Sequence, residues 1–153
     1  MADLPYVMPS KRVAAGALFV NDAGKVLLVN PTYKPQWEIP GGLVEENEPP
    51  RAACIREVEE EIGLQIEPGR LLSLDYRPAP ATRADMLRFV FWGGQLDKAQ
   101  IAAIHLDLDE LSEWGFYSVG EARERLSPSL GEVIASCLEL LEGERTQYVE
   151  FIR

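Results

Sequence analysis

The sequence predicts a domain that mixes strands and helices, of the α/β or α+β class. Short runs rich in Val, Leu and aromatic residues are typical of strands, and they alternate with two or three segments of helical periodicity. The length of 153 residues, of which 46% are hydrophobic and 26% charged, is enough for a sizeable core. We therefore expect residues 1–153 to form one domain, although the pattern alone does not specify the order of the strands.

Strands dominate the first part of the chain before the first helix. A hairpin is indicated, because Asn-Asp-Ala-Gly separates two segments rich in Val, Ala and Leu. The paired glycines Gly41 and Gly42 follow a short aromatic segment and allow a close approach of the backbone to a ligand. The expected elements are a loose lead-in with two prolines (1–10), a strand (12–20), a turn (21–24), a strand (25–30), a polar loop (31–36) and a short strand (37–40).

A helix is predicted between Pro49 and Gly63. Prolines suit the first turn of a helix, where no backbone donor is needed, and glycine suits the left-handed residue that ends one. Ile55, Val58 and Ile62 fall on one side at helical spacing, so this side should pack against the core.

The second half of the chain continues the alternation. Ser118 and Glu121 have the spacing of a capping box, and Ser127 with Pro128 predicts the start of another helix. The expected elements are strands over 71–76, 86–92 (ended by two glycines) and 114–117, a loop over 77–85, helices over 118–126 and 128–142, an ambiguous stretch over 97–108 (short helix or loop) and a final strand or tail over 148–152.

Three carboxylates share one side of the first predicted helix. Glu57, Glu60 and Glu61 are spaced i, i+3 and i+4, so they repel each other unless a cation lies between them. Oxygen ligands alone favour a hard cation such as Mg²⁺, which commonly also binds substrate phosphates. A magnesium–phosphate site is one interpretation, and a solvated acidic face is the other.

The segment 42–64 resembles the Nudix box, G-x5-E-x7-R-E-U-x-E-E-x-G-U, where U is a bulky aliphatic residue. The pattern is matched without departure by Gly42, Glu48, Arg56, Glu57, Val58, Glu60, Glu61, Gly63 and Leu64. The short strand and Pro-Gly-Gly turn before the helix extend the resemblance upstream. It implies the Nudix fold, an α/β/α sandwich with a mixed sheet. It also implies hydrolysis of a nucleoside diphosphate linked to another group, with Mg²⁺ or alternatively Mn²⁺ as the cofactor.

The resemblance also implies roles for the residues of the box. Glu60 and Glu61 are expected as metal ligands, Glu57 as a ligand or as the base for the attacking water, and the carbonyl of Gly41 as a further ligand. Glu48 and Arg56 are expected to pair and to fix the loop against the helix, which an arginine beside a carboxylate would do. Gly42 and Gly63 are structural positions of the motif, and Glu59 is expected to be solvated.

Family members often carry another glutamate on a distant loop, just before an aromatic strand. The matching region here is the acidic segment 109–113, so Glu113 or Glu110 would fill the catalytic role. A solvated acidic loop is the alternative for both.

Substrate phosphates and bases need cationic and aromatic contacts. Arg88 is the first choice for a phosphate, because it interrupts an apolar strand where an unpaired charge is costly to bury; an outward-facing side chain is the alternative. Tyr33 and Trp37 would stack on a base. Weaker choices for the phosphate contact are Arg12, Lys34, Arg77 and Arg83.

The bulk properties restrict the partners. A net charge of −10 and the lack of a basic patch disfavour nucleic acid, capped RNA and an anionic membrane, but not a small phosphorylated ligand. Cys54 and Cys137 are expected as buried free thiols, and no signal or membrane-span pattern is visible. We expect a cytoplasmic protein, with a homodimer left open.

The predicted function is a magnesium-dependent pyrophosphohydrolase that acts on a nucleoside triphosphate, ADP-ribose or a nucleotide sugar. Pro80 lies sixteen residues after Leu64, as in some Nudix enzymes that act on ADP-ribose, but this signal is weak. The alternative is a Nudix-like module that binds a nucleotide without cleaving it. The intact box favours the enzyme.

Overall fold

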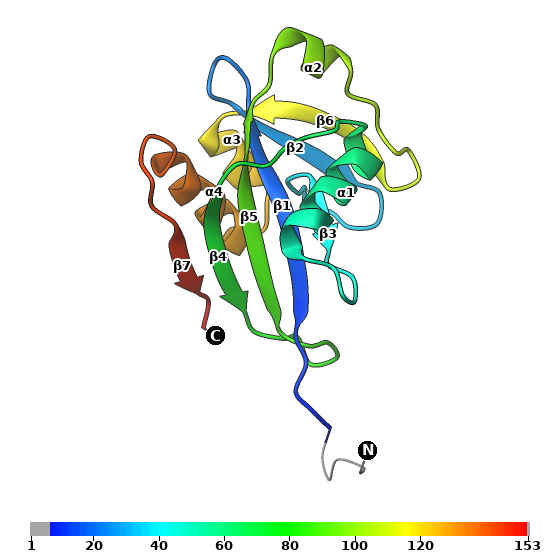
Figure 1. Ribbon diagram of the computed structural model, residues 1–153, viewed down its shortest axis with the longest axis vertical. Coiled ribbons are helices and arrows are strands. Elements are labelled where there is room, and N and C mark those ends of the chain that lie inside the picture. Colours follow the sequence, from blue (N-terminus) through cyan, green and yellow to red (C-terminus); the bar gives the residue numbers. More distant parts are fainter. Residues whose placement is uncertain (1–6, 153) are drawn as a thin grey trace.

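The computed structural model describes residues 7–152, in which seven strands alternate with four helices (Figure 1). The strands are β1 (Arg12–Val20), β2 (Val26–Pro31), β3 (Gly41–Leu43), β4 (Leu71–Arg77), β5 (Met86–Gln95), β6 (Leu111–Tyr117) and β7 (Gln147–Glu150). The helices are α1 (Pro50–Ile62), α2 (Lys98–Ala102), α3 (Val119–Arg125) and α4 (Pro128–Glu139).

All seven strands belong to one mixed sheet. Its order is β6-β2-β1-β5-β4-β7, and β3 pairs with β1 off this path. The β1–β5 and β4–β7 pairs are parallel, and the other pairs are antiparallel. Because β2 joins β1 at Val20 and β3 joins it over Ala14–Gly16, the short β3 strand occupies the free length of the same edge of β1. This position brings the paired glycines against the middle of the sheet.

Helices cover both faces of the sheet, as an α/β/α sandwich requires. One apolar cluster joins α1 to strand residues such as Ala15 and Phe19, and a second joins α3 and α4 to residues such as Leu18 and Val90. Successive strand residues point to opposite faces, which explains why neighbours in β1 belong to different clusters. Figure 1 shows α1 in front of the sheet and α3 and α4 behind it. The expected fold class is confirmed.

The strand predicted over 86–92 is longer than expected, because Gly93 and Gly94 do not end it. β5 continues to Gln95, and its register with β1 shifts between Leu18 and Phe19, so that Phe19 pairs with Gly94. A Cβ on Gly93 would lie 2.5 Å from the Phe19 ring. The glycine is therefore needed for ring packing at a bulge and not for a turn.

Three other boundaries differ from the prediction. β6 begins at Leu111, before the expected aromatic segment, because buried Leu111 pairs with Pro31, while Ser112 and Glu113 after it are exposed. α4 ends at Glu139 and not at 142, since the Leu140 N–H already bonds to the Cys137 carbonyl in a tightened last turn. Segment 37–40 forms only isolated bridges, and the regular strand lies on the glycines that follow.

The ambiguous segments take regular structure. Residues 97–108 contain α2, whose capping box is formed by Asp97 and Gln100, and the last described residues contain β7. Residues 7–10 of the expected lead-in have no regular structure, and residues 1–6 lie outside the described part of the chain. Cys54 and Cys137 are buried free thiols, as expected. Within the described range, every helix is too short or too polar to cross a membrane.

Candidate active site

The acidic side chains of α1 are positioned by the packing of the helix. Ala53, Cys54, Val58 and Ile62 are buried against the sheet, which fixes the rotation of the helix about its axis. Gly63 ends the helix with a φ of 73°, as predicted. The carboxylates beside the buried stripe consequently face β3 and the loop before the helix, while Glu59 is exposed, as expected.

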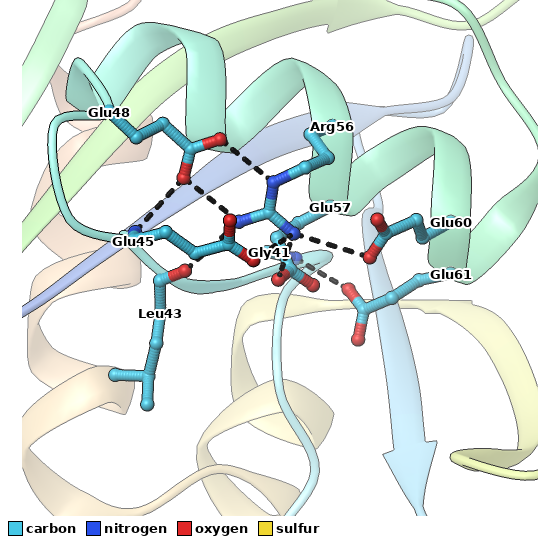
Figure 2. Close-up of polar contacts among 8 residues, drawn as sticks. All are labelled: Gly41, Leu43, Glu45, Glu48, Arg56, Glu57, Glu60 and Glu61. Atoms are coloured by element: carbon cyan, nitrogen blue, oxygen red, sulfur yellow. Dashed lines mark hydrogen bonds and ion pairs between the residues drawn. The ribbon is translucent and has the colours of Figure 1, made fainter.

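An ion pair between Glu48 and Arg56 ties the loop after β3 to the helix (Figure 2). The Arg56 Nε and Nη2 donate to the two oxygens of Glu48 at 2.8 and 2.9 Å, and Nη2 also donates to the Leu43 carbonyl at 3.2 Å. Arg56 lowers the pKa of Glu48 to about 2, chiefly through these hydrogen bonds. The pairing expected from the motif is therefore present, and it holds the loop on the acidic side of α1.

Arg56 also contacts two of the three clustered carboxylates. Its Nη1 donates to Glu57 at 2.8 Å and to Glu60 at 3.3 Å. Hydrogen bonding to Glu48, followed by its bonds and charge interactions with Glu57, raises the pKa of Arg56, so the guanidinium stays charged. Since Glu45 also lies 3.7 Å from Nη1, one cation serves four carboxylates, and the cluster keeps an excess of negative charge.

The carboxyl group of Glu57 occupies space that only a glycine in β3 leaves open. A Cβ on Gly42 would lie 2.4 Å from the Glu57 carboxyl carbon. Burial raises the pKa of Glu57, although Arg56 opposes this effect. Gly42 is therefore required by the close approach of an acidic side chain to the sheet.

Glu61 is the most deeply buried acid of the cluster. Glu61 is only 8% exposed, and its Oε1 accepts a hydrogen bond from the Gly41 N–H at 2.7 Å (Figure 2). Burial raises the pKa of Glu61 to about 8, and the carboxylates of Glu57 and Glu110 act in the same direction. Among residues 7–152, no Lys or Arg pairs with Glu61.

This donor set fits a hard divalent cation in its chemistry. It offers only carboxylate and carbonyl oxygens, and a buried acid with a raised pKa gains stability when a cation neutralises it. In the present conformation, no three such side chains of the described residues converge on one point. Arg56 holds Glu57 and Glu60, so a cation beside Glu61 would have to draw these two carboxylates away from the guanidinium.

The structure brings Glu110, and not Glu113, towards the box. The N–H groups of His105 and Asp107 donate to the carbonyls of Ile62 and Glu61 at 2.8 and 3.0 Å, which docks the acidic loop on the end of α1. Glu110 follows this contact and raises the pKa of both Glu57 and Glu61. Glu113 is exposed in β6, where it pairs with Asn30.

Arg88 has a partner that the sequence did not reveal. It is 8% exposed, and its Nε and Nη2 each donate to an oxygen of the fully buried Asp75 at 2.9 Å. It therefore neither faces outward nor lacks a partner. A sequence signal did exist, because Asp75 in β4 and Arg88 in β5 are charges of opposite sign within largely apolar segments.

The other residues predicted to bind substrate, Tyr33, Trp37 and Arg12, have different surroundings. Tyr33 is exposed near the box, and partial burial of its hydroxyl, followed by the charges of Glu38 and Glu61, raises its pKa. Trp37 packs edge-on against Tyr117, with ring centroids 5.4 Å apart, and contributes to the core on the α4 side. Arg12 lies at the start of β1, where its Nε donates to the Ala84 carbonyl at 2.9 Å.

Comparisons of the sequence and of the fold with known proteins both identify Nudix proteins as similar to this chain. The NUDIX domain model matches residues 10–137. The chain is 29% identical over 116 residues to Nudix hydrolase 25 of Arabidopsis thaliana, covering 72% of this chain and 65% of that protein. It is 30% identical over 128 residues to ADP-ribose pyrophosphatase of Mycobacterium tuberculosis, covering 80% and 59%.

Solved structures agree on the architecture. The MutT protein from Methanosarcina mazei superimposes with a TM-score of 0.74 at 21% identity, covering 90% of this chain and all of that one. At this identity the likeness establishes the fold alone. The chain spans about two thirds or less of the length of both curated relatives.

Proposed function

We propose that this chain, which belongs to the Nudix family, is a hydrolase that cleaves the P–O–P bridge of a nucleoside diphosphate linked to another group. Nucleoside triphosphates, ADP-ribose and nucleotide sugars all contain this bridge. The observation that carries the proposal is Glu61, a buried acid without a cationic partner among the described residues, beside Glu57 and Glu60. Such a cluster is costly unless a cation and a phosphorylated substrate share it.

The residues that would hold Mg²⁺, or alternatively Mn²⁺, are Glu57, Glu60, Glu61 and the carbonyl of Gly41. When bound, the cation makes a water molecule easier to deprotonate and stabilises negative charge on the leaving phosphate. Arg56 holds Glu57 and Glu60 on the same side of α1 and limits their repulsion. The Glu48–Arg56 pair fixes the loop beside them and is a positioning element.

Glu57 and Glu110 are the two candidates for the base that removes a proton from the attacking water. Glu57 has a raised pKa and lies partly buried against Gly42. Glu110 lies on the docked acidic loop and interacts electrostatically with both Glu57 and Glu61. We favour Glu110 over Glu113 for the role of the loop carboxylate, because Glu113 lies farther along β6 on its exposed side.

The test is a panel of nucleoside diphosphate and triphosphate derivatives, assayed for release of monophosphate or phosphate with and without Mg²⁺. We expect turnover of at least one member that is abolished by EDTA and restored by Mg²⁺. Tight binding of a nucleotide with no turnover of any member would instead support a module that binds without cleaving.

A further inference from the structure

A hollow lined by three arginines lies at the end of the sheet where β1 and β5 begin and β4 ends. Its volume is about 420 Å³, and it is lined by Arg12, Arg77, Pro78, Pro80, Arg83, Ser129 and Phe151. We call it the arginine hollow. Figure 1 shows the loop between β4 and β5 beside the start of β1 at this end of the sheet. Three elements that are distant in sequence, namely β1, this loop and the start of α4, therefore meet here.

The arginines of the hollow have no ion-pair partner among the described carboxylates, although the charges of Asp75 and Glu38 act on Arg77 from beyond ion-pair distance. Within residues 7–152, no Asp or Glu forms an ion pair with Arg12, Arg77 or Arg83. Among residues 7–152, the buried Nε of Arg77 has no hydrogen-bond partner, and its Nη2 donates to the sulfur of Met86 at 3.5 Å. A buried donor without an acceptor is costly, so this guanidinium is suited to an anionic ligand.

The electrostatics of Arg77 agree with this geometry. Burial, and then the neighbouring positive charge of Arg88, lower the pKa of Arg77. The charges of Asp75 and Glu38 oppose this shift only in part, and both oxygens of Asp75 are bonded to Arg88. In a chain with a net charge of −10, a cationic hollow of this kind is a local exception.

The start of α4 adds a second, independent preference for an anion. Ser129 lies in the first turn of this twelve-residue helix, and it lines the arginine hollow. The first backbone N–H groups of a helix have no acceptor within it, and the helix dipole places positive charge at this end. Pro128 has no N–H and the Leu130 N–H is capped by the Ser127 side chain, so the Ser129 N–H is the backbone donor left at this end. Ser129 and the guanidinium groups line the same hollow, which is a favourable arrangement for phosphate.

The arginine hollow lies on the α4 side of the sheet and the acidic cluster on the α1 side, and Glu38 connects them, because its charge acts on both Arg77 and Glu61. Gly41 pairs with Gly16 of β1, and Arg12 lies four residues from Gly16 along the same strand, a separation of about 13 Å at about 3.3 Å per residue. Arg12 and Arg77 both pair with Met86, so they flank β5 at the same level of the sheet, on the two strands next to it. Their long side chains shorten the gap, so that a sugar ring would bridge a diphosphate at the box and a second anionic group in the hollow.

We propose that the arginine hollow binds a phosphate monoester carried by the substrate on the sugar next to the diphosphate. This inference deepens the proposed function and rests on it. It narrows the substrate class to diphosphate compounds that carry a further phosphate, and it gives Arg12, Arg77 and Arg83 a common role in specificity.

The test uses pairs of ligands that differ only by one phosphate monoester on the ribose: coenzyme A with dephospho-coenzyme A, and NADPH with NADH. Binding is measured by calorimetry in EDTA, where no magnesium-dependent turnover occurs. We expect the phosphorylated member of at least one pair to bind about tenfold more tightly or better, since each charge-assisted contact is strong. Arg77→Gln and Arg83→Gln should each reduce this preference, and the double variant should abolish it.

The control is Arg145→Gln, which removes the same charge from an exposed arginine outside the arginine hollow. It should leave the preference unchanged. Arg83 lies on the exposed loop, so its variant remains informative if Arg77→Gln fails to fold. Equal binding within both pairs would overturn the proposal, as would a preference that survives in the double variant. Binding of inorganic phosphate alone, without a preference within the pairs, would also overturn it. A lack of hydrolysis in the magnesium panel would instead count against the proposed function.

Discussion

The acidic site on α1 and the arginine hollow carry charges of opposite sign. In each of them, the charged side chains outnumber their partners of opposite charge. At the acidic site, Glu57 and Glu60 share one guanidinium and Glu61 has no cationic partner among the described residues, whereas the hollow gathers arginines without an ion-paired carboxylate in the described part of the chain. Elsewhere, charges that serve the fold are paired. Glu48 with Arg56 and Asp75 with Arg88 each form two hydrogen bonds between one guanidinium and one carboxylate.

This contrast separates charges that are paired within the protein and stabilise it from charges that are left unpaired and are available to a ligand. A paired charge is satisfied by the chain itself, so its replacement should reduce stability more than substrate specificity. An unpaired charge carries a cost in the free protein that a ligand relieves, so its replacement should reduce binding or turnover while stability is kept or even raised. Substitutions on each side of this division test it.

The largest expected effect is on turnover, from Glu61→Gln. The change removes one negative charge from the buried acid and keeps its shape, so we expect magnesium-dependent turnover to fall by about 100-fold or more. The unfolding free energy of the metal-free protein should stay the same or rise, because a buried carboxyl with a raised pKa no longer has to ionise. Steady-state kinetics and urea unfolding measure the two quantities.

The matched control is Glu59→Gln, on the exposed side of the same helix. It should change neither quantity appreciably. Near-normal turnover of the Glu61 variant at the usual Mg²⁺ concentration would remove Glu61 from the site.

The second effect is on stability, from Asp75→Asn. This change leaves the buried Arg88 without its charged partner, which typically costs about 3–5 kcal/mol of unfolding free energy. Replacing both residues, Arg88→Met with Asp75→Leu, should recover much of the loss. The KM of the double variant then decides the predicted role of Arg88 at a substrate phosphate: an unchanged KM assigns it to the fold, and a raised KM assigns it to the substrate.

Asp85→Asn is the comparison for this pair. Asp85 is partly exposed, pairs with the exposed Lys11 and accepts a hydrogen bond from the Tyr76 hydroxyl, which an asparagine oxygen can still accept; its replacement should therefore change the unfolding free energy far less than Asp75→Asn does. Similar losses for the two variants would contradict the structural importance of the buried pair.

The sequence predicted the features of the site that depend on local spacing. Glu48, Arg56 and the three acids lie within one loop and one helix, so the motif specified their relation before any tertiary contact was known. The helix boundaries were also accessible, because prolines and a glycine mark both ends. The sandwich with a mixed sheet came from the family resemblance and not from the pattern, and the order of the strands was not predicted.

Features that depend on distant contacts were not accessible. Glu110 approaches the box because the Asp107 N–H bonds to the carbonyl of Glu61, a contact between loop and helix with no counterpart in local sequence. The partner of Arg88 is set by the register between β4 and β5, which includes an irregularity between Leu71 and Ser73. The arginine hollow forms only when β1, the loop after β4 and α4 come together, so the sequence did not indicate that its arginines lie close to one another.

The smallest expected effect concerns the pH dependence of stability at the acidic site. Glu61 has a pKa of about 8 in the folded protein, against about 4.5 when unfolded. Between these values the folded state binds a proton that the unfolded state has lost, so the unfolding free energy should fall as pH rises from about 5 to 8. The fall should be roughly 1–3 kcal/mol, since each pH unit in this window changes it by up to about 1.4 kcal/mol and neighbouring charges adjust.

Urea unfolding of the metal-free protein at several pH values measures this slope. Glu57, whose pKa is also raised, contributes with the same sign, whereas Glu48, with a pKa of about 2, contributes only under more acidic conditions. Glu61→Gln should therefore flatten the slope, and Glu59→Gln should preserve it. Mg²⁺ should restore stability most at the upper end of the range, because it binds the ionised carboxylates. Equal slopes for the wild type and the Glu61 variant would show that Glu61 does not ionise with the raised pKa that we assign to it. The distinction between charges paired within the protein and charges left for a ligand would then rest on the arginine hollow alone.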